Sequence, residues 1–330
     1  MPASTAATAS STATEPDFTP LLVRAKAEIA QGIFQFDLER ADGAELPAFT
    51  PGAHITLQTP AGMRRNYSLC SAPSQRQRYQ IAIKREAQGR GGSLGMADGV
   101  GIGESLLASA PRNNFELPAQ ASDLLFIAGG IGITPIMSML RHLQELGLPP
   151  WRLRYLTRDA ASTAFFDELR VPPFADKVLI HHDQGDPDKA LDLWPLLERP
   201  TRAHVMCCGP RGLMDSVRDM SGHWPTEQIH FESFGVDSSA TALNKAFSVR
   251  LARGGQSIEV GAQQSILQAL RGAGVQVASS CESGTCGSCR VGLLQGQAEH
   301  RDMVLLDDEK ADNIMVCVSR ASGEELVLDL

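Results

Sequence analysis

The 330-residue sequence has few aromatic residues and no excess of positive charge. Phe, Trp and Tyr make up 5% of the chain, and 30 Lys and Arg stand against 38 Asp and Glu, for a net charge of −8. Surfaces that bind nucleic acid combine aromatic rings for base stacking with basic patches for phosphates. The composition therefore argues against nucleic acid and against an anionic membrane surface as partners.

Long apolar runs and targeting signals are also missing from the sequence. No stretch approaches the roughly 18 consecutive apolar residues of a membrane-spanning helix. The first 14 residues are Ala, Ser and Thr except for one Met and one Pro, so they lack both the apolar core of a secretory signal and the Arg of a transit peptide. We therefore expect a disordered tail over residues 1–17 and a cytoplasmic protein.

Cysteine is sparse over most of the chain and concentrated in one place. There are seven cysteines, and three of them fall within nine residues late in the sequence. An odd number, clustered in this way and without a secretory signal, does not fit a framework of disulfides. The pattern instead predicts a reducing compartment and a metal site.

The order of predicted elements divides the chain into three domains. Residues 18–120 contain evenly spaced short strands separated by Gly and Pro, which is typical of a small antiparallel β-barrel. Residues 121–234 alternate apolar strands with amphipathic helices, which predicts a doubly wound parallel sheet of the α/β class. The small, polar residues of 235–245 predict a linker. Residues 246–330 then form a predicted α+β domain, with a short helix at 305–312.

The late cysteines have the C-x4-C-x2-C spacing of a plant-type [2Fe–2S] site, followed by a distant fourth cysteine. One tight loop would supply three thiolates, and a neighbouring strand, predicted at 314–319, would supply the fourth. Gly284 and Gly287 allow the loop to curl. A structural zinc site is the alternative, although zinc sites usually use two C-x2-C pairs and this segment has one. The four candidate metal ligands are Cys281, Cys286, Cys289 and Cys317.

A glycine-rich turn joins an apolar strand to a helix at the start of the second domain. Glycines allow a backbone to approach a phosphate closely, and a helix N-terminus offers free N–H groups and a positive dipole. The turn lacks the G-x-G-x-x-G spacing, so a purely structural turn is the alternative. The candidate residues are Gly129, Gly130, Gly132, Thr134 and Pro135.

Acidic residues follow the next two predicted strands, where an adenosine ribose would lie. Asp159 can accept a hydrogen bond from a ribose 2′-hydroxyl and repel a 2′-phosphate, whereas Arg158 would favour the phosphate. Asp183, at the end of the following strand, is a candidate for the adenine side. These residues favour NADH over NADPH, and solvated loop charge is the alternative.

Two groups of residues in the predicted barrel suit an anionic ligand. An Arg-x-Tyr-Ser segment combines a cation, an aromatic ring and a hydroxyl. A later glycine-rich loop exposes backbone N–H groups beside a second arginine, which suits a terminal phosphate monoester. The residues are Arg65, Asn66, Tyr67 and Ser68, then Ala82, Ile83 and Lys84, then Arg90, Gly91, Gly92 and Ser93.

In chain order, these motifs resemble those of one family. GRGGS, AGGIGITP, HHDQGDP, CCGP, HFESFG and the cysteine loop follow one another as in the phthalate dioxygenase reductase family, over about residues 18–330. That family is part of the ferredoxin–NAD(P)⁺ reductase superfamily, and residues 246–330 resemble a plant-type ferredoxin. The resemblance implies a flavin-binding antiparallel β-barrel, a nucleotide-binding α/β domain and a β-grasp ferredoxin domain.

The resemblance also implies how the barrel holds its flavin. Tyr67 would offer its ring to the isoalloxazine, and Ser68 would lie near the flavin N5, which receives hydride. Arg65 would neutralise the phosphate, and Phe234 would cover the ring. Because the loop suits a single phosphate, FMN is favoured over FAD.

In the nucleotide domain, the resemblance implies roles for the glycine-rich turn and for the motif CCGP. Thr134 would touch both flavin and nucleotide. Cys208, followed by Gly209 and Pro210, would lie beside the nicotinamide, whereas Cys207 would be a packed thiol.

The family implies an electron-transfer reductase. NADH would deliver a hydride to FMN, and single electrons would pass through a [2Fe–2S] cluster to a separate oxygenase with a Rieske centre and non-haem iron. The partner would act on phthalate, or on vanillate or another substrate. The alternatives are a reductase of a multicomponent monooxygenase, which usually resembles FAD proteins with the ferredoxin domain first, and a non-catalytic, zinc-stabilised module.

Overall fold

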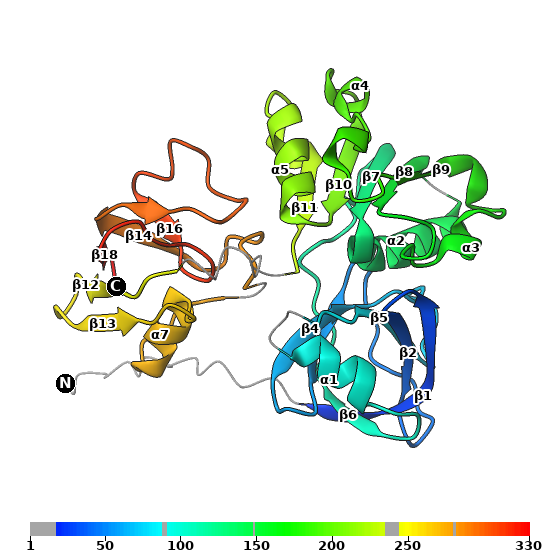
Figure 1. Ribbon diagram of the computed structural model, residues 1–330, viewed down its shortest axis with the longest axis horizontal. Coiled ribbons are helices and arrows are strands. Elements are labelled where there is room, and N and C mark those ends of the chain that lie inside the picture. The colour runs from blue at the N-terminus through cyan, green and yellow to red at the C-terminus, as the bar shows by residue number, and fades with distance from the viewer. Residues whose placement is uncertain (1–17, 88–90, 148, 235–243, 280–281) are drawn as a thin grey trace, which may run out of the picture.

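The computed structural model shows three parts, each built around its own β-sheet (Figure 1). The predicted tail at 1–17 and most of the predicted linker at 235–245 lie outside the described residues. The residues that the structure describes are 18–87, 91–147, 149–234, 244–279 and 282–330.

The first part is an antiparallel sheet of six strands in the order β4-β3-β6-β1-β2-β5. Its outer strands meet at a bridge between Leu69 and Ile81, beside which the Cys70 N–H donates to the Gln80 carbonyl at 2.7 Å, so the sheet closes into the predicted barrel. The elements are β1 (Thr19–Ala30), β2 (Ile33–Glu39), β3 (His54–Gln58), β4 (Arg64–Ser68), β5 (Tyr79–Lys84), α1 (Gly92–Gly99) and β6 (Ser105–Ala108).

The second part is a parallel sheet in the order β11-β10-β7-β8-β9, which confirms the predicted doubly wound topology. The chain order reverses between β7 and β10, and ligands bind such sheets at the carboxyl ends of the strands at this point. The strands are β7 (Asp123–Gly129), β8 (Trp151–Thr157), β9 (Val178–His182), β10 (Ala203–Cys208) and β11 (Ile229–Glu232). The helices are α2 (Ile133–Leu146), α3 (Phe166–Leu169), α4 (Trp194–Leu197) and α5 (Arg211–Met220), with short 3₁₀ turns η1 (Gly130–Gly132), η2 (Ala175–Lys177), η3 (Pro187–Lys189) and η4 (Thr226–Gln228).

The third part is a mixed sheet in the order β13-β12-β18-β14-β16, in which β12 and β18 are parallel and the other pairs are antiparallel. A capping box between Ser265 and Gln268 starts α7, whose apolar face packs on the sheet as expected for a β-grasp domain. The elements are β12 (Phe247–Leu251), β13 (Ser257–Val260), α7 (Ile266–Gly272), β14 (Arg290–Gln295), β15 (Ala298–Glu299), β16 (Asn313–Met315), β17 (Arg320–Ala321) and β18 (Glu325–Leu328).

Two local predictions in the third part are wrong. Residues 305–312 form turns instead of a helix, because the Glu309 carboxylate accepts from the Leu306 N–H and is paired with Arg290 of β14. The predicted strand at 314–319 ends at Met315, and Cys317 lies in the turn that follows.

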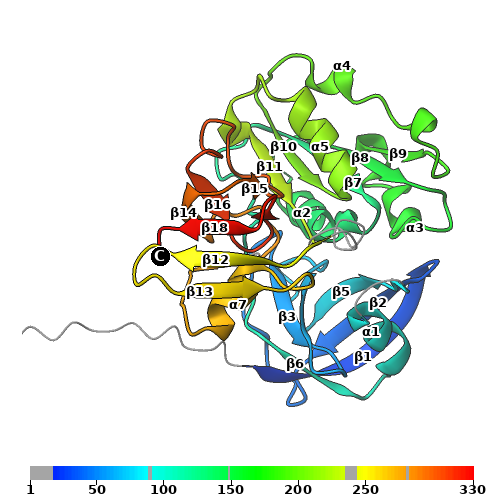
Figure 2. The same ribbon diagram turned by 60° about the vertical axis from the view of Figure 1, so that its left-hand side comes forward.

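Apolar and polar contacts join the three parts. Ile33 and Phe115 from the barrel side are buried in one core with Leu140 of α2. Arg211 of α5 donates to the main-chain oxygen of Arg301 in the third part. Figure 2 shows the third part alongside both of the others. Among the helices of the described residues, none combines the length and apolarity that a bilayer crossing requires.

Candidate active site

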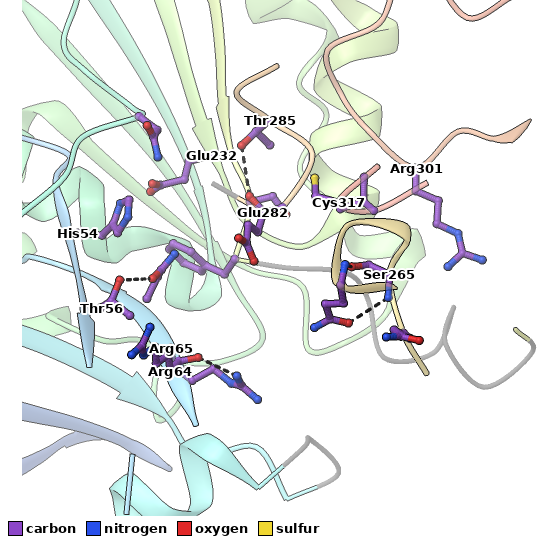
Figure 3. A pocket seen from close by; sticks show the side chains of 18 of the residues that line it. His54, Thr56, Arg64, Arg65, Glu232, Ser265, Glu282, Thr285, Arg301 and Cys317 are labelled. Atoms are coloured by element: carbon purple, nitrogen blue, oxygen red, sulfur yellow. Dashed lines mark hydrogen bonds between the residues drawn. The ribbon is translucent and has the colours of Figure 1, made fainter. Parts of the chain in front are cut away.

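Residues from all three parts line one cleft of about 410 Å³, which is within the usual range for ligand pockets (Figure 3). His54 and Ser68 come from the barrel and Glu232 from the end of β11, while Thr285 and Cys317 come from the third part. Figure 3 shows Glu232 and His54 on one side of the cleft and Cys317 on the other. A flavin held here would therefore lie between the nucleotide sheet and the cysteine loop.

The Arg-x-Tyr-Ser segment forms β4 and contributes most of its side chains to this cleft. Ser68 is buried at the end of the strand, and the Asn66 side chain accepts a hydrogen bond from the Thr56 hydroxyl at 2.8 Å. A Cβ on Gly92 would lie only 3.2 Å from the Arg65 Nε. The structure thus brings Arg65 against the start of α1, next to Gly91 and Ser93, as a phosphate cradle requires.

Tyr67 of the barrel has a buried hydroxyl group that could bind a ligand. Its ring packs against the barrel core, and within the described part of the chain its buried hydroxyl has no hydrogen-bond partner. Burial raises the pKa of Tyr67 to about 12, so the phenol stays protonated. A ligand with a polar edge would satisfy this group, and the residues present therefore fit a bound FMN.

In the segment Ala82–Lys84 of β5, backbone atoms are better placed than side chains to contact a flavin. Ala82 packs in the core shared with the nucleotide domain, and Ile83 points into the barrel. Lys84 is exposed and lies 3.5 Å from Glu86. Any contact of the buried pair with a flavin would therefore run through its backbone. Gly91 has a φ of +82°, which suits glycine, and Arg90 lies outside the described residues.

The glycine-rich turn touches the CCGP motif directly. A Cβ on Gly132 would lie 2.2 Å from the Cys208 carbonyl oxygen, and one on Gly129 would lie 2.6 Å from Pro210. A Cβ on Gly209 would in turn lie 2.9 Å from the Gly129 backbone. These glycines allow two backbones to touch, a packing role that the sequence did not predict for Gly129 and Gly132.

Gly130 differs from these glycines, because the space beside its backbone is open and a phosphate could approach it. Its φ is +52°, and no atom lies within 4 Å of where a Cβ would be. The turn leads into the 14-residue helix α2, whose N-terminus faces the carboxyl edge of the sheet. Thr134 is buried there and donates to the Ile131 carbonyl at 3.0 Å, while Pro135 occupies a first-turn position where no N–H is needed.

Cys208 is fully buried at the end of β10. It lies in the core on the α2 face of the sheet, whereas Cys207 lies in the core on the opposite face. Burial raises the pKa of the Cys208 thiol far above its usual value, and the neighbouring Glu232, its register partner on β11, raises it further. Cys208 is therefore a neutral thiol, suited to packing and not to nucleophilic chemistry.

The two acidic candidates lie at the carboxyl ends of β8 and β9. One oxygen of Asp159 accepts from the Ser162 N–H at 2.8 Å, a bond that lowers the pKa of this carboxyl. Asp183 accepts from the Gly185 N–H at 2.7 Å, and its own N–H donates to the Thr157 carbonyl at 3.1 Å. Both side chains are fixed by turns at the edge where a nucleotide would bind.

The cysteine loop folds over the turn that carries Cys317. Pairing of β14 with β16 brings the Cys289 carbonyl to the Val316 N–H at 3.3 Å, next to Cys317. Gly284 and Gly287 both have a φ of +78°, and a Cβ on Gly284 would lie 2.8 Å from Val318. The glycines therefore serve the loop curvature that the sequence predicted.

The donor set suits an iron–sulfur cluster. Cys289 and Cys317 are buried and Cys286 is half-buried, so three predicted ligands belong to one compact segment. Cys281 lies outside the described residues, and the described residues contain no group of three or more His, Cys, Asp or Glu placed to hold a metal ion. All four predicted donors are cysteines, and four cysteine thiolates are the usual ligands of a plant-type [2Fe–2S] cluster.

Comparisons with known proteins decide the family. A model of the 2Fe-2S iron-sulfur cluster binding domain matches residues 249–322. The chain is 55% identical over 314 residues to the phthalate 4,5-dioxygenase oxygenase reductase subunit of Pseudomonas putida, covering 95% of this chain and 97% of that one. It is 53% identical over 317 residues to the phthalate dioxygenase reductase of Burkholderia cepacia, covering 96% and 98%. The chain belongs to the phthalate dioxygenase reductase family.

A solved structure agrees with this assignment. It is described as phthalate dioxygenase reductase, a modular structure for electron transfer from pyridine nucleotides to [2Fe-2S], and it matches this chain with a TM-score of 0.77 at 52% identity. The match covers 95% of this chain and 98% of that chain. The three-part architecture found here is therefore that of the phthalate dioxygenase reductase family.

The cleft-lining residues that the sequence did not predict include Glu232, His54 and Arg301. Glu232 precedes the predicted ring cover Phe234, which is half exposed beside the cleft, and its place at a strand end was a usable signal. His54 and Arg301 carried no such signal, because no motif surrounds either residue. Only the folded chain brings them to the cleft.

Crowding at the turn predicts that Gly132→Ala destabilises the nucleotide domain. The added Cβ must displace the Cys208 carbonyl, at a cost of about 1–3 kcal/mol. Gly212→Ala is the control, since nothing lies within 4 Å of its Cβ position in α5 and alanine favours a helix by about 1 kcal/mol. The thermal midpoint should fall for Gly132→Ala and not for Gly212→Ala, and equal midpoints would contradict the packing role.

Burial also predicts slow thiol chemistry. Burial raises the pKa of Cys70 to about 12 and raises that of Cys207 and Cys208 further, so little thiolate exists at neutral pH. Peptide mapping after iodoacetamide treatment should show these three cysteines unmodified until the protein is unfolded. Modification of Cys208 in the folded protein at the rate of a free cysteine would refute its burial.

Proposed function

We propose that this member of the phthalate dioxygenase reductase family passes electrons from NADH to a separate oxygenase with a Rieske centre and non-haem iron. The observation that carries the proposal is the single cleft that residues of all three parts share. When bound, NADH supplies hydride, FMN takes up the two electrons and releases them singly, and the [2Fe–2S] cluster carries one electron at a time.

The protein's part in this chemistry is to bind, orient and exclude water. Arg65 and the start of α1 would hold the FMN phosphate, while Tyr67 would hold the ring with Phe234 as its cover. The hydride-transfer step requires stacking of the two rings and no proton abstraction by a residue. After both electrons have left singly, the hydrogen that arrived as hydride would leave the flavin as a proton. Ser68, buried at the cleft, would place a hydroxyl near the reacting edge.

The nucleotide would lie across the carboxyl edge of the parallel sheet. The open backbone at Gly130 and the N-terminus of α2 would face its phosphates. Cys208, neutral and buried, would pack beside the nicotinamide, and the fixed carboxylate of Asp159 would accept from the ribose 2′-hydroxyl. The same carboxylate would repel a 2′-phosphate, which supports NADH as donor.

The domain boundaries follow the same proposal. The flavin domain would occupy 18–120, the nucleotide domain 121–234 and the ferredoxin domain 246–330, with a linker at 235–245. β7 starts at Asp123 and β12 at Phe247, which supports these limits.

The names of the two relatives support phthalate as the substrate of the partner. A vanillate-type demethylase is the second candidate partner, and the odd number of cysteines, clustered late in the sequence, supports a reducing, cytoplasmic location.

Loss of one cluster ligand should stop electron transfer through the cluster but leave reduction of the flavin by NADH intact. Cys317→Ala removes a thiolate, so the variant should lose cluster absorbance and NADH-dependent reduction of the partner oxygenase while it still reduces ferricyanide from the flavin. Cys207→Ala is the matched control, because that buried thiol lies on the far face of the parallel sheet. Oxygenase reduction by Cys317→Ala at the wild-type rate would overturn the proposed path.

Asp159 provides a test of nucleotide choice. Asp159→Ser removes the carboxylate that would accept from the ribose 2′-hydroxyl, so kcat/KM for NADH should fall by about 10-fold. The ratio of kcat/KM for NADH to that for NADPH should fall in steady-state assays. An unchanged ratio would show that this carboxylate does not meet the ribose.

A further inference from the structure

Arg141 of α2 joins the nucleotide domain to the barrel through a partly buried network. Its Nη1 donates to the Cys70 carbonyl at 2.8 Å and to the Gln80 side chain at 3.1 Å. Its Nε and Nη2 donate to the two carboxylate oxygens of Glu168 on α3 at 2.9 and 2.7 Å. The side chain is 18% exposed, so one guanidinium binds both domains largely away from water.

The barrel end of this network lies beside the flavin strands. Cys70 and Gln80 flank the bridge at which β4 and β5 meet. Cys70 is two residues beyond Ser68, which lines the cleft, and Gln80 is two residues before Ala82. A shift at this bridge would therefore move both strands that face the flavin.

The other end of the network lies on the helix that starts at the glycine-rich turn. α2 begins at Ile133, directly after Gly132, so Arg141 lies about two turns along the same rigid helix. Glu168 fixes the guanidinium from α3, and the Phe165 ring lies 5.4 Å from it. The position of the guanidinium is thus determined by the nucleotide domain.

On the barrel side of the network, polar contacts also hold Gln80 in place. The Gln80 amide donates to Asp37 of β2 at 3.0 Å, and Asp37 also pairs with Arg78 at 3.0 Å. A continuous chain of polar contacts therefore runs from β2 of the barrel to α3 of the nucleotide domain. Hydrogen-bond networks that are shielded from water in part stabilise the arrangement of the groups that they join.

We propose that Arg141 is a positioning residue for hydride transfer, which holds the flavin strands of the barrel in register with the nucleotide turn at the start of α2. The inference rests on the proposed function, since it assumes that FMN and NADH meet between these two elements. Arg141 does not line the cleft, so it would act through the strands and not on either cofactor. Misplacement of reacting groups by 1 Å can cost about 100-fold in rate.

Three variants test the proposal. Arg141→Met removes all four hydrogen bonds, and Arg141→Lys keeps the charge but cannot bind Cys70 and Glu168 together because lysine lacks the planar fork. Arg152→Met is the control, since Arg152 is an exposed arginine of the same domain that pairs only with Asp123, at 3.2 Å, in the described residues.

Anaerobic stopped-flow mixing with NADH would measure the limiting rate of flavin reduction and the apparent Kd for NADH. Arg141→Met should lower the limiting rate by about 10- to 100-fold, Arg141→Lys by less, and Arg152→Met by nothing, with bound FMN and the Kd for NADH unchanged. A lower limiting rate at an unchanged Kd, with a smaller loss for lysine than for methionine, is the signature of positioning.

Two results would overturn the inference. One is a wild-type limiting rate in folded Arg141→Met, and the other is a loss that lies in FMN content or NADH affinity. If Arg141→Met does not fold, Glu168→Gln weakens one side of the network and should give a smaller decrease in the same limiting rate. Failure of NADH to reduce the flavin of the wild-type protein would instead refute the proposed function.

Discussion

Two turns of backbone touch at the carboxyl end of the parallel sheet, and the rest of the site depends on that contact. Gly132 has no side chain, so the turn after β7 lies directly against the Cys208 carbonyl at the end of β10. This contact sets the direction in which α2 leaves the sheet. It also fixes the ends of β10 and β11, from which Cys208 enters the core and Glu232 reaches the cleft.

Each of the other two parts is attached to this sheet by an arginine. Arg141 fastens the barrel to α2 through the strands that carry the flavin motif. On the other side, Arg211 of α5 donates to the main chain of Arg301 in the ferredoxin part, and the Arg301 side chain donates to Asn244, just before that part, at 2.8 Å. Contacts with the nucleotide domain thus position both neighbouring parts. Residues of all three parts line one shared cleft (Figure 3).

Local patterns predicted most of the fold. Strand alternation, helical periodicity and the cysteine spacing depend on neighbours in sequence, and these predictions agree with the three sheets. The helix expected at 305–312 is wrong because Arg290, distant in sequence, holds Glu309 in a turn.

The functional site was harder to predict than the fold, because many of its contacts join residues that are distant in sequence. The motifs located β4, the glycine-rich turn and the cysteine loop, but they gave no sign that Gly132 also packs against a strand about 75 residues away. Arg141 and Arg301 belong to no motif, and their partners lie 71 and 57 residues away along the chain. Such contacts follow from the tertiary structure and leave no local signal in a single sequence.

The central claim is that one cleft connects a hydride donor to a one-electron carrier. Anaerobic titration of the purified protein with NADH, followed by visible absorbance and electron paramagnetic resonance, tests it most directly. The account predicts bleaching of FMN together with the signal of a reduced [2Fe–2S] cluster in the same chain. A protein that contains zinc in place of the cluster, or in which NADH reduces the flavin while the cluster stays oxidised, would contradict it.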